Sequence, residues 1–186
     1  MKRSIRVFFL LILVFLLTLT CSKNKNNQQT SSSEQSQTKV APEEGYYAPG
    51  FQLLDLNGKA VSLTDYNKKI VLVNFWATWC GFCKKEIPSM EALYQMLNKR
   101  GFEILAISVD RLSPAEVKSF VLKYKMSFPV LLNPFGDIAK QYNVPGLPAS
   151  FLVDQKGIIR WKVIGARDWM DERMIEKIEE LLGPPT

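Results

Sequence analysis

The stretch NFWATWCGFCKKEIP, residues 74–88, decides the fold of this 186-residue chain. It joins an apolar run, Ile70–Trp76, to a long helical pattern, and it places Cys80 and Cys83 where the helix should begin. A helix N-terminus offers unpaired backbone N–H groups and the positive end of the helix dipole, and both favour a thiolate over a thiol. We therefore expect Cys80 to be the attacking sulfur of a thiol-based site.

The spacing of the two cysteines suits redox chemistry. Cys83 should lie one turn further into the helix than the more exposed Cys80, so the two sulfurs could close a small ring after Cys80 forms a mixed disulfide. A purely structural disulfide is one alternative, but closing a four-residue loop stabilises a fold by only about 2 kcal/mol. A zinc half-site is another, but it lacks two further ligands. The chain has no histidine, and we expect no metal site.

Strand and helix patterns alternate along the rest of the chain. Asn57-Gly58 suits a two-residue hairpin turn, Ser113 a helix N-cap, and Pro114 the first position of that helix. The pattern predicts an α/β sandwich with a mixed sheet. The expected strands are 51–55, 59–63, 70–76, 102–109, 128–132, 149–153 and 158–164, and the expected helices are 81–100, 114–124, 137–142 and 169–182.

The amino-terminal residues have the composition of an export segment. A basic start precedes an apolar run, Val7–Thr20, which is too short for a bilayer-spanning helix of roughly 17–25 residues. We predict a signal peptide at 1–20, a lipid-anchored flexible tether at 21–45 with Cys21 as the acylated residue, and one domain at 46–186. This layout predicts an extracytoplasmic protein attached to a lipid membrane through Cys21.

The net charge of +6 belongs mostly to the export and tether segments. Residues 1–40 carry six Lys or Arg and one acid, a net of +5, so the remainder carries a net of +1. A nearly neutral domain has no basic stripe for a phosphate backbone. We expect no nucleic-acid partner.

Residues 74–88 resemble the active-site stretch of the thioredoxin superfamily, in particular its membrane-tethered TlpA/ResA-like branch. The turn Gly146-Leu147-Pro148 before a strand, followed by Asp154 and Gly157, resembles the second half of that family's pattern. The resemblance implies a thioredoxin-like three-layer sandwich with an N-terminal β-hairpin extension. It also implies a thiol-disulfide oxidoreductase that reduces protein disulfides, for example in cytochrome c maturation, with electrons from a membrane-embedded thiol donor. No cofactor is needed, because the cysteine pair itself cycles.

Two polar residues near the cysteines take a role from this resemblance. Glu86 corresponds to an acidic residue that exchanges protons with the active-site thiols or tunes them; considered alone, a Glu in the second helical turn is usually solvated. Asn74 stands where cytosolic thioredoxins have a buried acid, and it equally suits the satisfaction of polar groups within the sheet. Asp110, at the end of a strand, is expected to form a turn, and Trp161 and Trp169 are assigned no function.

The resemblance also places a substrate groove. Pro148 matches a cis-proline opposite the cysteines, and the backbone at Leu147 and Pro148 would pair with a substrate peptide as an added strand. Trp79 would pack beside that groove. Phe82 replaces the proline common between such cysteines, which leaves the direction of electron flow open, and it could contact a partner protein.

Three other functions remain as alternatives. A thiol peroxidase shares the fold and the hairpin extension, but the motif around its reactive cysteine differs from residues 79–83. A copper chaperone of this fold uses a wider cysteine spacing and a histidine. A lipoprotein binding module with an inert disulfide would show no reductase activity.

Overall fold

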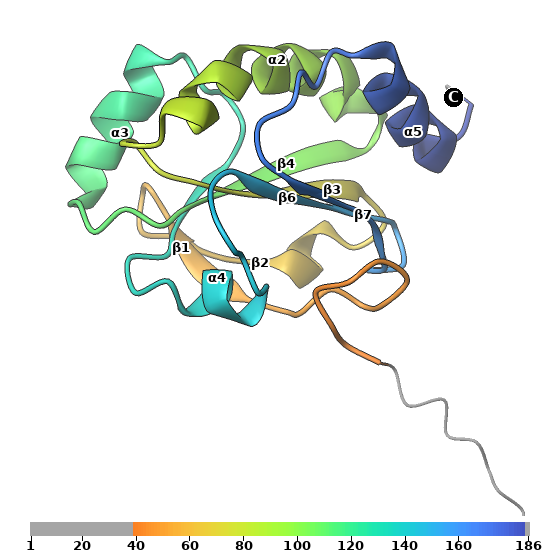
Figure 1. The fold of residues 1–186 in the computed structure, drawn as a ribbon, viewed down its shortest axis with the longest axis horizontal. Helices are drawn as coiled ribbons and strands as arrows, with labels where there is room; N and C mark the ends of the chain where they lie inside the picture. The colour runs from red at the N-terminus through yellow and green to blue at the C-terminus, as the bar shows by residue number, and fades with distance from the viewer. Residues whose placement is uncertain (1–38, 185–186) are drawn as a thin grey trace, which may run out of the picture. The chain divides into compact units, whose positions relative to one another are not determined.

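The computed structural model describes residues 39–184 (Figure 1). The predicted signal peptide, Cys21 and most of the predicted tether lie outside the described residues. Within residues 39–184, no helix is both long enough and apolar enough to span a bilayer.

One mixed sheet of seven strands, in the order β2-β1-β5-β4-β3-β6-β7, forms the middle layer. The apolar run β3 (Ile70–Trp76) is an interior strand, parallel to β4 (Phe102–Ser108) and antiparallel to β6 (Ala149–Val153), and every residue of all three strands is buried. This burial explains their nearly continuous apolar sequences. The remaining strands are β1 (Gln52–Asp55), β2 (Ala60–Ser62), β5 (Val130–Leu132) and β7 (Ile159–Ile164).

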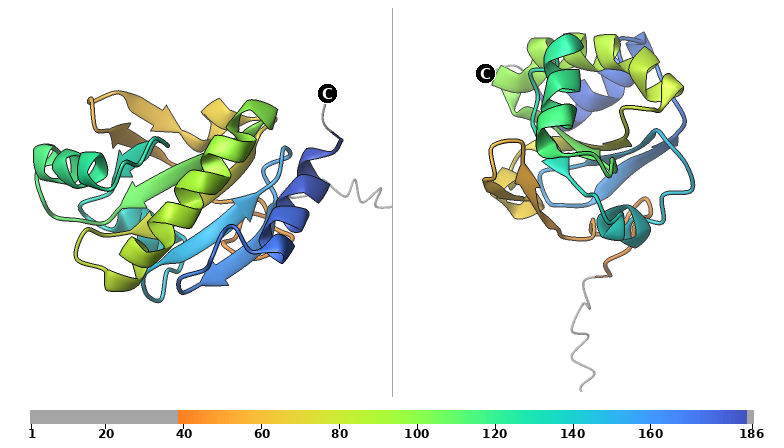
Figure 2. Two further views of the ribbon diagram at one scale, coloured as in Figure 1. Left: turned by 90° about the horizontal axis from the view of Figure 1, so that it is seen from above. Right: turned by 90° about the vertical axis from the view of Figure 1, so that its left-hand side faces the viewer.

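Helices cover both faces of the sheet and complete the three layers (Figures 1 and 2). Alternate residues of β3 enter two cores: Leu72 lies in the one beneath the longest helix, and Val73 lies in the other. The first face carries α2 (Gly81–Leu97), α3 (Pro114–Lys123) and α5 (Glu172–Leu182), and the second carries α4 (Asp137–Gln141) and the 3₁₀ helix η1 (Leu63–Tyr66). The predicted thioredoxin-like sandwich is confirmed.

The N-terminal β-hairpin is confirmed, but its turn is wider than the predicted two-residue turn. The Asp55 carboxylate accepts hydrogen bonds from the backbone N–H groups of Asn57 (2.8 Å) and Lys59 (2.9 Å). Gly58 has a positive φ of 81°, whereas Asn57 does not. The aspartate side chain therefore organises this turn, and only one of its residues needs the conformational freedom of glycine.

Several boundaries differ from the sequence prediction; α2, for example, ends at Leu97, and the 3₁₀ helix η2 (Asn98–Arg100) replaces its predicted last residues. Three of the differences have local reasons. Strand β5 begins only at Val130, after Pro129, which has no N–H to donate. Helix α5 begins at Glu172, because Asp171 is its N-cap and accepts the N–H of Arg173 at 3.1 Å. Residues 39–45, predicted as tether, lie against the domain, where Gly45 donates its N–H to the carbonyl of Ile159 at 2.8 Å.

Candidate active site

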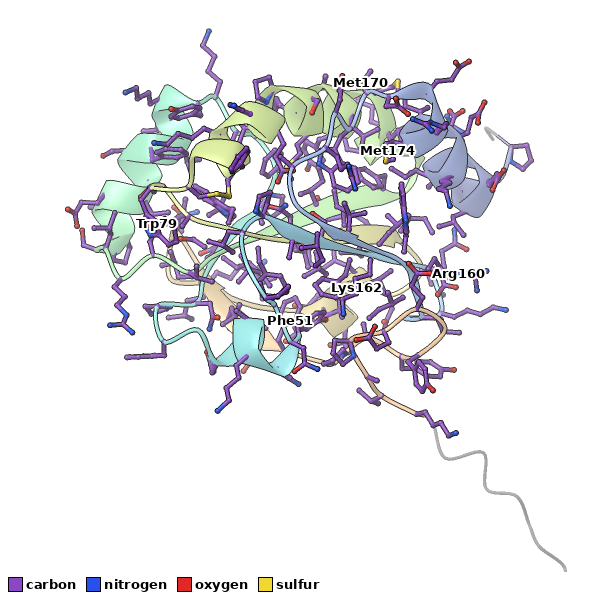
Figure 3. The ribbon with its side chains drawn as sticks, in the orientation of Figure 1. Phe51, Trp79, Arg160, Lys162, Met170 and Met174 are labelled. Atoms are coloured by element: carbon purple, nitrogen blue, oxygen red, sulfur yellow. A yellow bond between two sulfur atoms is a disulfide. The ribbon has the colours of Figure 1, made fainter. Side chains whose placement is uncertain are left out.

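The two cysteines lie at the start of helix α2, just after the end of strand β3, and they form a disulfide (Figure 3). Cys80 is the N-cap residue of α2, and its Sγ accepts the backbone N–H of Cys83 at 3.1 Å. Cys80 is 6% exposed and Cys83 is 1% exposed, so Cys80 is the more accessible sulfur, as predicted, although it keeps little surface in the oxidised state. A thiolate on Cys80 would lie at the positive end of the helix dipole.

The loop before Cys80 is held by a buried carboxylate. Asp110, 2% exposed, accepts hydrogen bonds from the backbone N–H of Thr78 at 2.9 Å and from the Thr78 hydroxyl at 2.7 Å. The hydroxyl of Ser108 donates to the same carboxylate at 2.8 Å. Asp110 therefore fixes the loop that presents the disulfide, but it does not itself lie in a turn, so the turn-forming interpretation was wrong.

Exposed apolar side chains flank the disulfide. Trp79 is 69% exposed (labelled in Figure 3) and Phe82 is 64% exposed, so both present a large aromatic surface next to the cysteines. The peptide bond between Leu147 and Pro148 is cis, as predicted, and Pro148 is buried at the start of β6, beside β3. The neighbouring cations Lys84 and Lys85 lie over the rings of Phe120 and Phe82, respectively.

Glu86 is buried rather than solvated, with 2% of its surface exposed. Its carboxylate accepts one hydrogen bond at Oε1, from the amide of Asn74 at 2.9 Å. It accepts two at Oε2, from the backbone N–H of Arg167 and the indole N–H of Trp169, both at 3.3 Å. The Asn74 amide also donates to Ser150 Oγ at 2.9 Å, so Asn74 links strands β3 and β6 to this carboxylate.

The environment of Glu86 suits proton exchange near neutral pH. Desolvation by burial raises the pKa of Glu86 from 4.5 to about 7, while the donors from Asn74, Arg167 and Trp169 act in the opposite direction. Glu86 lies on α2 one turn after Cys83, a spacing that places both residues on the same side of a helix. A carboxyl group that titrates near pH 7 at this position can take up or release a proton when the cysteines change state.

An open depression of about 320 Å³ borders Glu86 on the side of the loop between β7 and α5. Its other lining residues are Lys85, Pro88, Ser89, Ala166, Arg167 and Asp168. Among residues 39–184, no group of three or more histidine, cysteine, aspartate or glutamate side chains is placed to hold a metal ion.

The structure brings Cys80, Cys83 and Glu86 onto the first turns of one helix, and it adds two residues that the sequence did not indicate. Trp169 and Arg167 reach Glu86 from more than 80 positions further along the chain. No local pattern connects them to the cysteines, because a tryptophan before a helix ordinarily indicates only core packing. Trp169 is indeed part of the core, but its indole N–H faces the carboxylate.

A thioredoxin-like sheet, a disulfide at the N-cap of the first long helix and a cis-proline at the start of the neighbouring strand define a dithiol oxidoreductase of the thioredoxin superfamily. The AhpC/TSA family matches residues 45–162. The thiol-disulfide oxidoreductase ResA of Bacillus thuringiensis is 41% identical over 140 residues, which cover 75% of this chain and 77% of that protein. ResA of Bacillus subtilis is 38% identical over 146 residues, which cover 78% and 79%.

Solved structures agree with these relatives. A putative thiol:disulfide interchange protein DsbE from Chlorobium tepidum superposes with a TM-score of 0.70 at 30% identity, over 76% of this chain and 99% of that one. StoA from Bacillus subtilis superposes with a TM-score of 0.60 at 26% identity, over 70% and 97%. The chain belongs to the AhpC/TSA family and is a thiol-disulfide oxidoreductase of the TlpA/ResA-like branch.

Proposed function

We propose that this oxidoreductase reduces disulfides of exported proteins, for example in cytochrome c maturation. One observation carries the proposal: the sulfur of Cys80 accepts a backbone N–H at the start of α2, and the same helix carries, one turn after Cys83, a buried carboxyl group whose pKa is raised to about 7. An inert structural disulfide needs neither a stabilised thiolate nor a proton acceptor.

In the reduced protein, the Cys80 thiolate attacks one sulfur of the substrate disulfide. A new S–S bond joins Cys80 to the substrate, and the other substrate sulfur leaves as a thiolate that takes up a proton. Cys83 then loses its proton to the Glu86 carboxylate and attacks the Cys80 sulfur. The bond between Cys80 and the substrate breaks, and the second substrate sulfur leaves as a thiolate that takes up the proton from Glu86. The substrate has then gained two electrons and two protons, the first proton from solvent and the second from Cys83 through Glu86, and the protein disulfide seen in the structure is formed. An external dithiol then reduces that disulfide.

The substrate surface would combine the apolar side chains beside the disulfide with the backbone at Pro148. Trp79 and Phe82 expose apolar surface that a partner could cover, and their position next to Cys80 would align a substrate cysteine. An extended substrate segment would pair with the backbone at Leu147 and Pro148, at the start of β6.

The cellular setting of the proposal rests on the amino-terminal sequence. A basic start, a short apolar run and Cys21 support export and lipid anchoring at the outer face of a membrane. An anchored domain would meet a membrane-embedded thiol donor, which would return electrons to the Cys80–Cys83 disulfide.

Trapping of the mixed disulfide tests the function. Cys83→Ser removes the resolving thiol but keeps attack by Cys80, so we expect covalent complexes with exported cysteine-containing proteins, identifiable by mass spectrometry after expression in the native host. Cys80→Ser should form none of these complexes, and its rate of dithiol-dependent insulin reduction should fall about a hundredfold or more.

Three outcomes would contradict the proposal. Equal trapping by Cys80→Ser would show that Cys80 is not the attacking sulfur. Rapid consumption of peroxide with no reduction of insulin would favour the peroxidase alternative, and no turnover in either assay would favour the inert binding module.

A further inference from the structure

We propose that Trp169 is a positioning residue of this active site, whose indole N–H holds the Glu86 carboxylate in place and favours its charged form. The inference rests on the proposed function, because the position of Glu86 matters only if Glu86 exchanges protons with the thiols. Neither the cysteine motif nor the family relationship assigns a role to this tryptophan.

The polar neighbours of the Glu86 carboxylate are all donors. Asn74 donates to Oε1, and Arg167 and Trp169 donate to Oε2. A carboxylate can accept all three hydrogen bonds, whereas a protonated carboxyl group has less acceptor capacity and gains an O–H that these donors cannot accept. The arrangement therefore favours the charged form and opposes the desolvation that raises the pKa.

Trp169 is the donor in this set that a conservative substitution can remove cleanly. Its side chain is fully buried, and its ring belongs to the core under α2. The distance from Trp169 Nε1 to Glu86 Oε2 is 3.3 Å, longer than the usual 2.9–3.0 Å between donor and acceptor atoms. We therefore expect this contact to lower the pKa of the carboxyl group by a modest amount.

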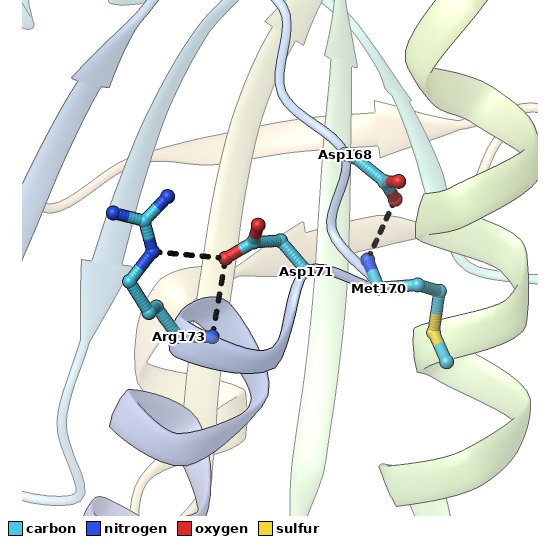
Figure 4. Close-up of polar contacts among 4 residues, drawn as sticks. All are labelled: Asp168, Met170, Asp171 and Arg173. Carbon is cyan, nitrogen blue, oxygen red and sulfur yellow. Dashed lines mark hydrogen bonds and ion pairs between the residues drawn. The ribbon is translucent and has the colours of Figure 1, made fainter.

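The loop before α5 holds Trp169 in its place. The backbone N–H of Trp169 donates to Ser89 Oγ at 3.1 Å, and the Ser89 hydroxyl donates to the carbonyl of Glu86 at 2.9 Å. On either side of Trp169, the Asp168 carboxylate accepts the N–H of Met170 at 3.0 Å, and Asp171 caps α5 (Figure 4). The indole is thus connected to the same helical turn that carries Glu86.

The other groups around Glu86 leave a clear role for this neutral donor. Strands β3 and β6 face the carboxylate with the neutral side chains of Asn74 and Ser150. The charged residues of the adjoining depression, Lys85 from α2 and Arg167 and Asp168 from the loop, are exposed to solvent, which screens their effect. Helix α2 also carries Lys84, whose ammonium group lies over the ring of Phe120, and it carries the two cysteines, which do not titrate while they form the disulfide.

Trp169→Phe tests the inference, because phenylalanine keeps an aromatic ring but lacks the N–H. Carbon-13 NMR of the glutamate carboxyl groups in the oxidised full-length protein, with Glu86→Gln for assignment, would give the Glu86 midpoint without interference from thiol titration. We expect that midpoint, about 7 in the unaltered protein, to rise by about 0.5 to 1 in Trp169→Phe.

The same substitution elsewhere provides the control. Trp161→Phe removes an indole N–H that does not contact Glu86, so its midpoint should stay unchanged. The pH profile of disulfide reduction should move upward with the Glu86 midpoint in Trp169→Phe only. A folded Trp169→Phe protein with an unchanged midpoint would overturn the inference.

A second measurement covers the case in which Trp169→Phe does not fold. In the unaltered protein, the nitrogen-15 resonance of the Trp169 indole should shift with pH at the Glu86 midpoint, and Glu86→Gln should abolish this shift. A pH-independent resonance would overturn the contact. Full reductase activity in Glu86→Gln would instead overturn the proton-transfer role in the proposed function, while the NMR midpoints would still report on the contact.

Discussion

Two buried carboxyl groups hold the segments on either side of the cysteines: Glu86 follows Cys83 by three residues, and Asp110 is bonded to Thr78, two residues before Cys80. Their hydrogen-bond partners give them different roles. Asp110 accepts from the backbone and hydroxyl of Thr78 and from Ser108, which fixes the loop before Cys80. Glu86 accepts only N–H groups at longer average distances, and burial raises its pKa to about 7. Asp110 is therefore a structural acceptor, and Glu86 is the group suited to proton exchange.

Glu86 should make the stability of the oxidised protein depend on pH. Its pKa of about 7 lies above the ordinary value of 4.5, so between these two values the folded state holds a proton that the unfolded state releases. Stability from this residue is thus full below about pH 4.5 and falls as the pH rises to about 7, by roughly 3 kcal/mol in all.

Urea unfolding of the oxidised protein at about pH 5 and about pH 8, compared with Glu86→Gln, measures this effect. The stability of the unaltered protein relative to the variant should be greater at the lower pH, because glutamine cannot titrate. Parallel stability profiles for the two proteins would show that Glu86 has an ordinary pKa in the folded state.

At the scale of elements, the sequence was sufficient to predict those helices and strands whose patterns are local. The apolar run of β3, the Ser113 N-cap of α3 and the cysteine pair at the start of α2 all lie where predicted. The predictions were wrong where one side chain overrides the periodic pattern. Asp171 is the N-cap of α5, so the helix begins at Glu172 instead of at Trp169. Trp169 satisfies the helical periodicity, but it lies before the cap and packs toward Glu86 instead.

The start of α3 provides a test of local structure that is independent of the active site. Ser113 and Glu116 form a capping box, in which each side chain accepts the backbone N–H of the other residue. Ser113→Ala should destabilise the protein by about 1 kcal/mol, measured by urea unfolding, because the backbone N–H of Glu116 loses its acceptor and the Glu116 carboxylate loses the Ser113 hydroxyl donor.

Ser119→Ala is the matched control for this prediction. Ser119 lies within the same helix, and its hydroxyl donates to the carbonyl of Ala115, an interaction that helices do not need. Its replacement should change stability by less than about 0.5 kcal/mol. Equal effects of the two substitutions would indicate that the cap contributes nothing, and neither should change the alkylation rate of Cys80 in the reduced protein.

Across the domain, the cysteine site and residues 39–48 lie at opposite ends of the sheet. Cys80 follows the carboxyl end of β3, and Pro148 precedes the start of the antiparallel β6. The site therefore forms only when segments about 70 to 80 positions apart meet. The cysteines belong to a local motif and could be predicted from sequence, whereas the donors of Arg167 and Trp169 to the Glu86 carboxylate have no local pattern and could not. The turn from β6 to β7 lies at the other end, against residues 39–48.

Residues 39–48 should stabilise the domain without affecting its chemistry. Gly45 and Ala48 donate N–H groups to the carbonyls of Ile159 and Gly157, and Ile159 donates to Tyr46, so this segment covers the backbone beside β7. A chain that begins at residue 49 should be less stable to urea than one that begins at residue 39 by roughly 2–3 kcal/mol, about 1 kcal/mol for each lost bond. Because the segment lies at the end of the sheet remote from Cys80, both chains should react with iodoacetamide at the same rate when reduced and folded. A slower reaction in the shorter chain, at equal folded fraction, would show that the two ends are coupled.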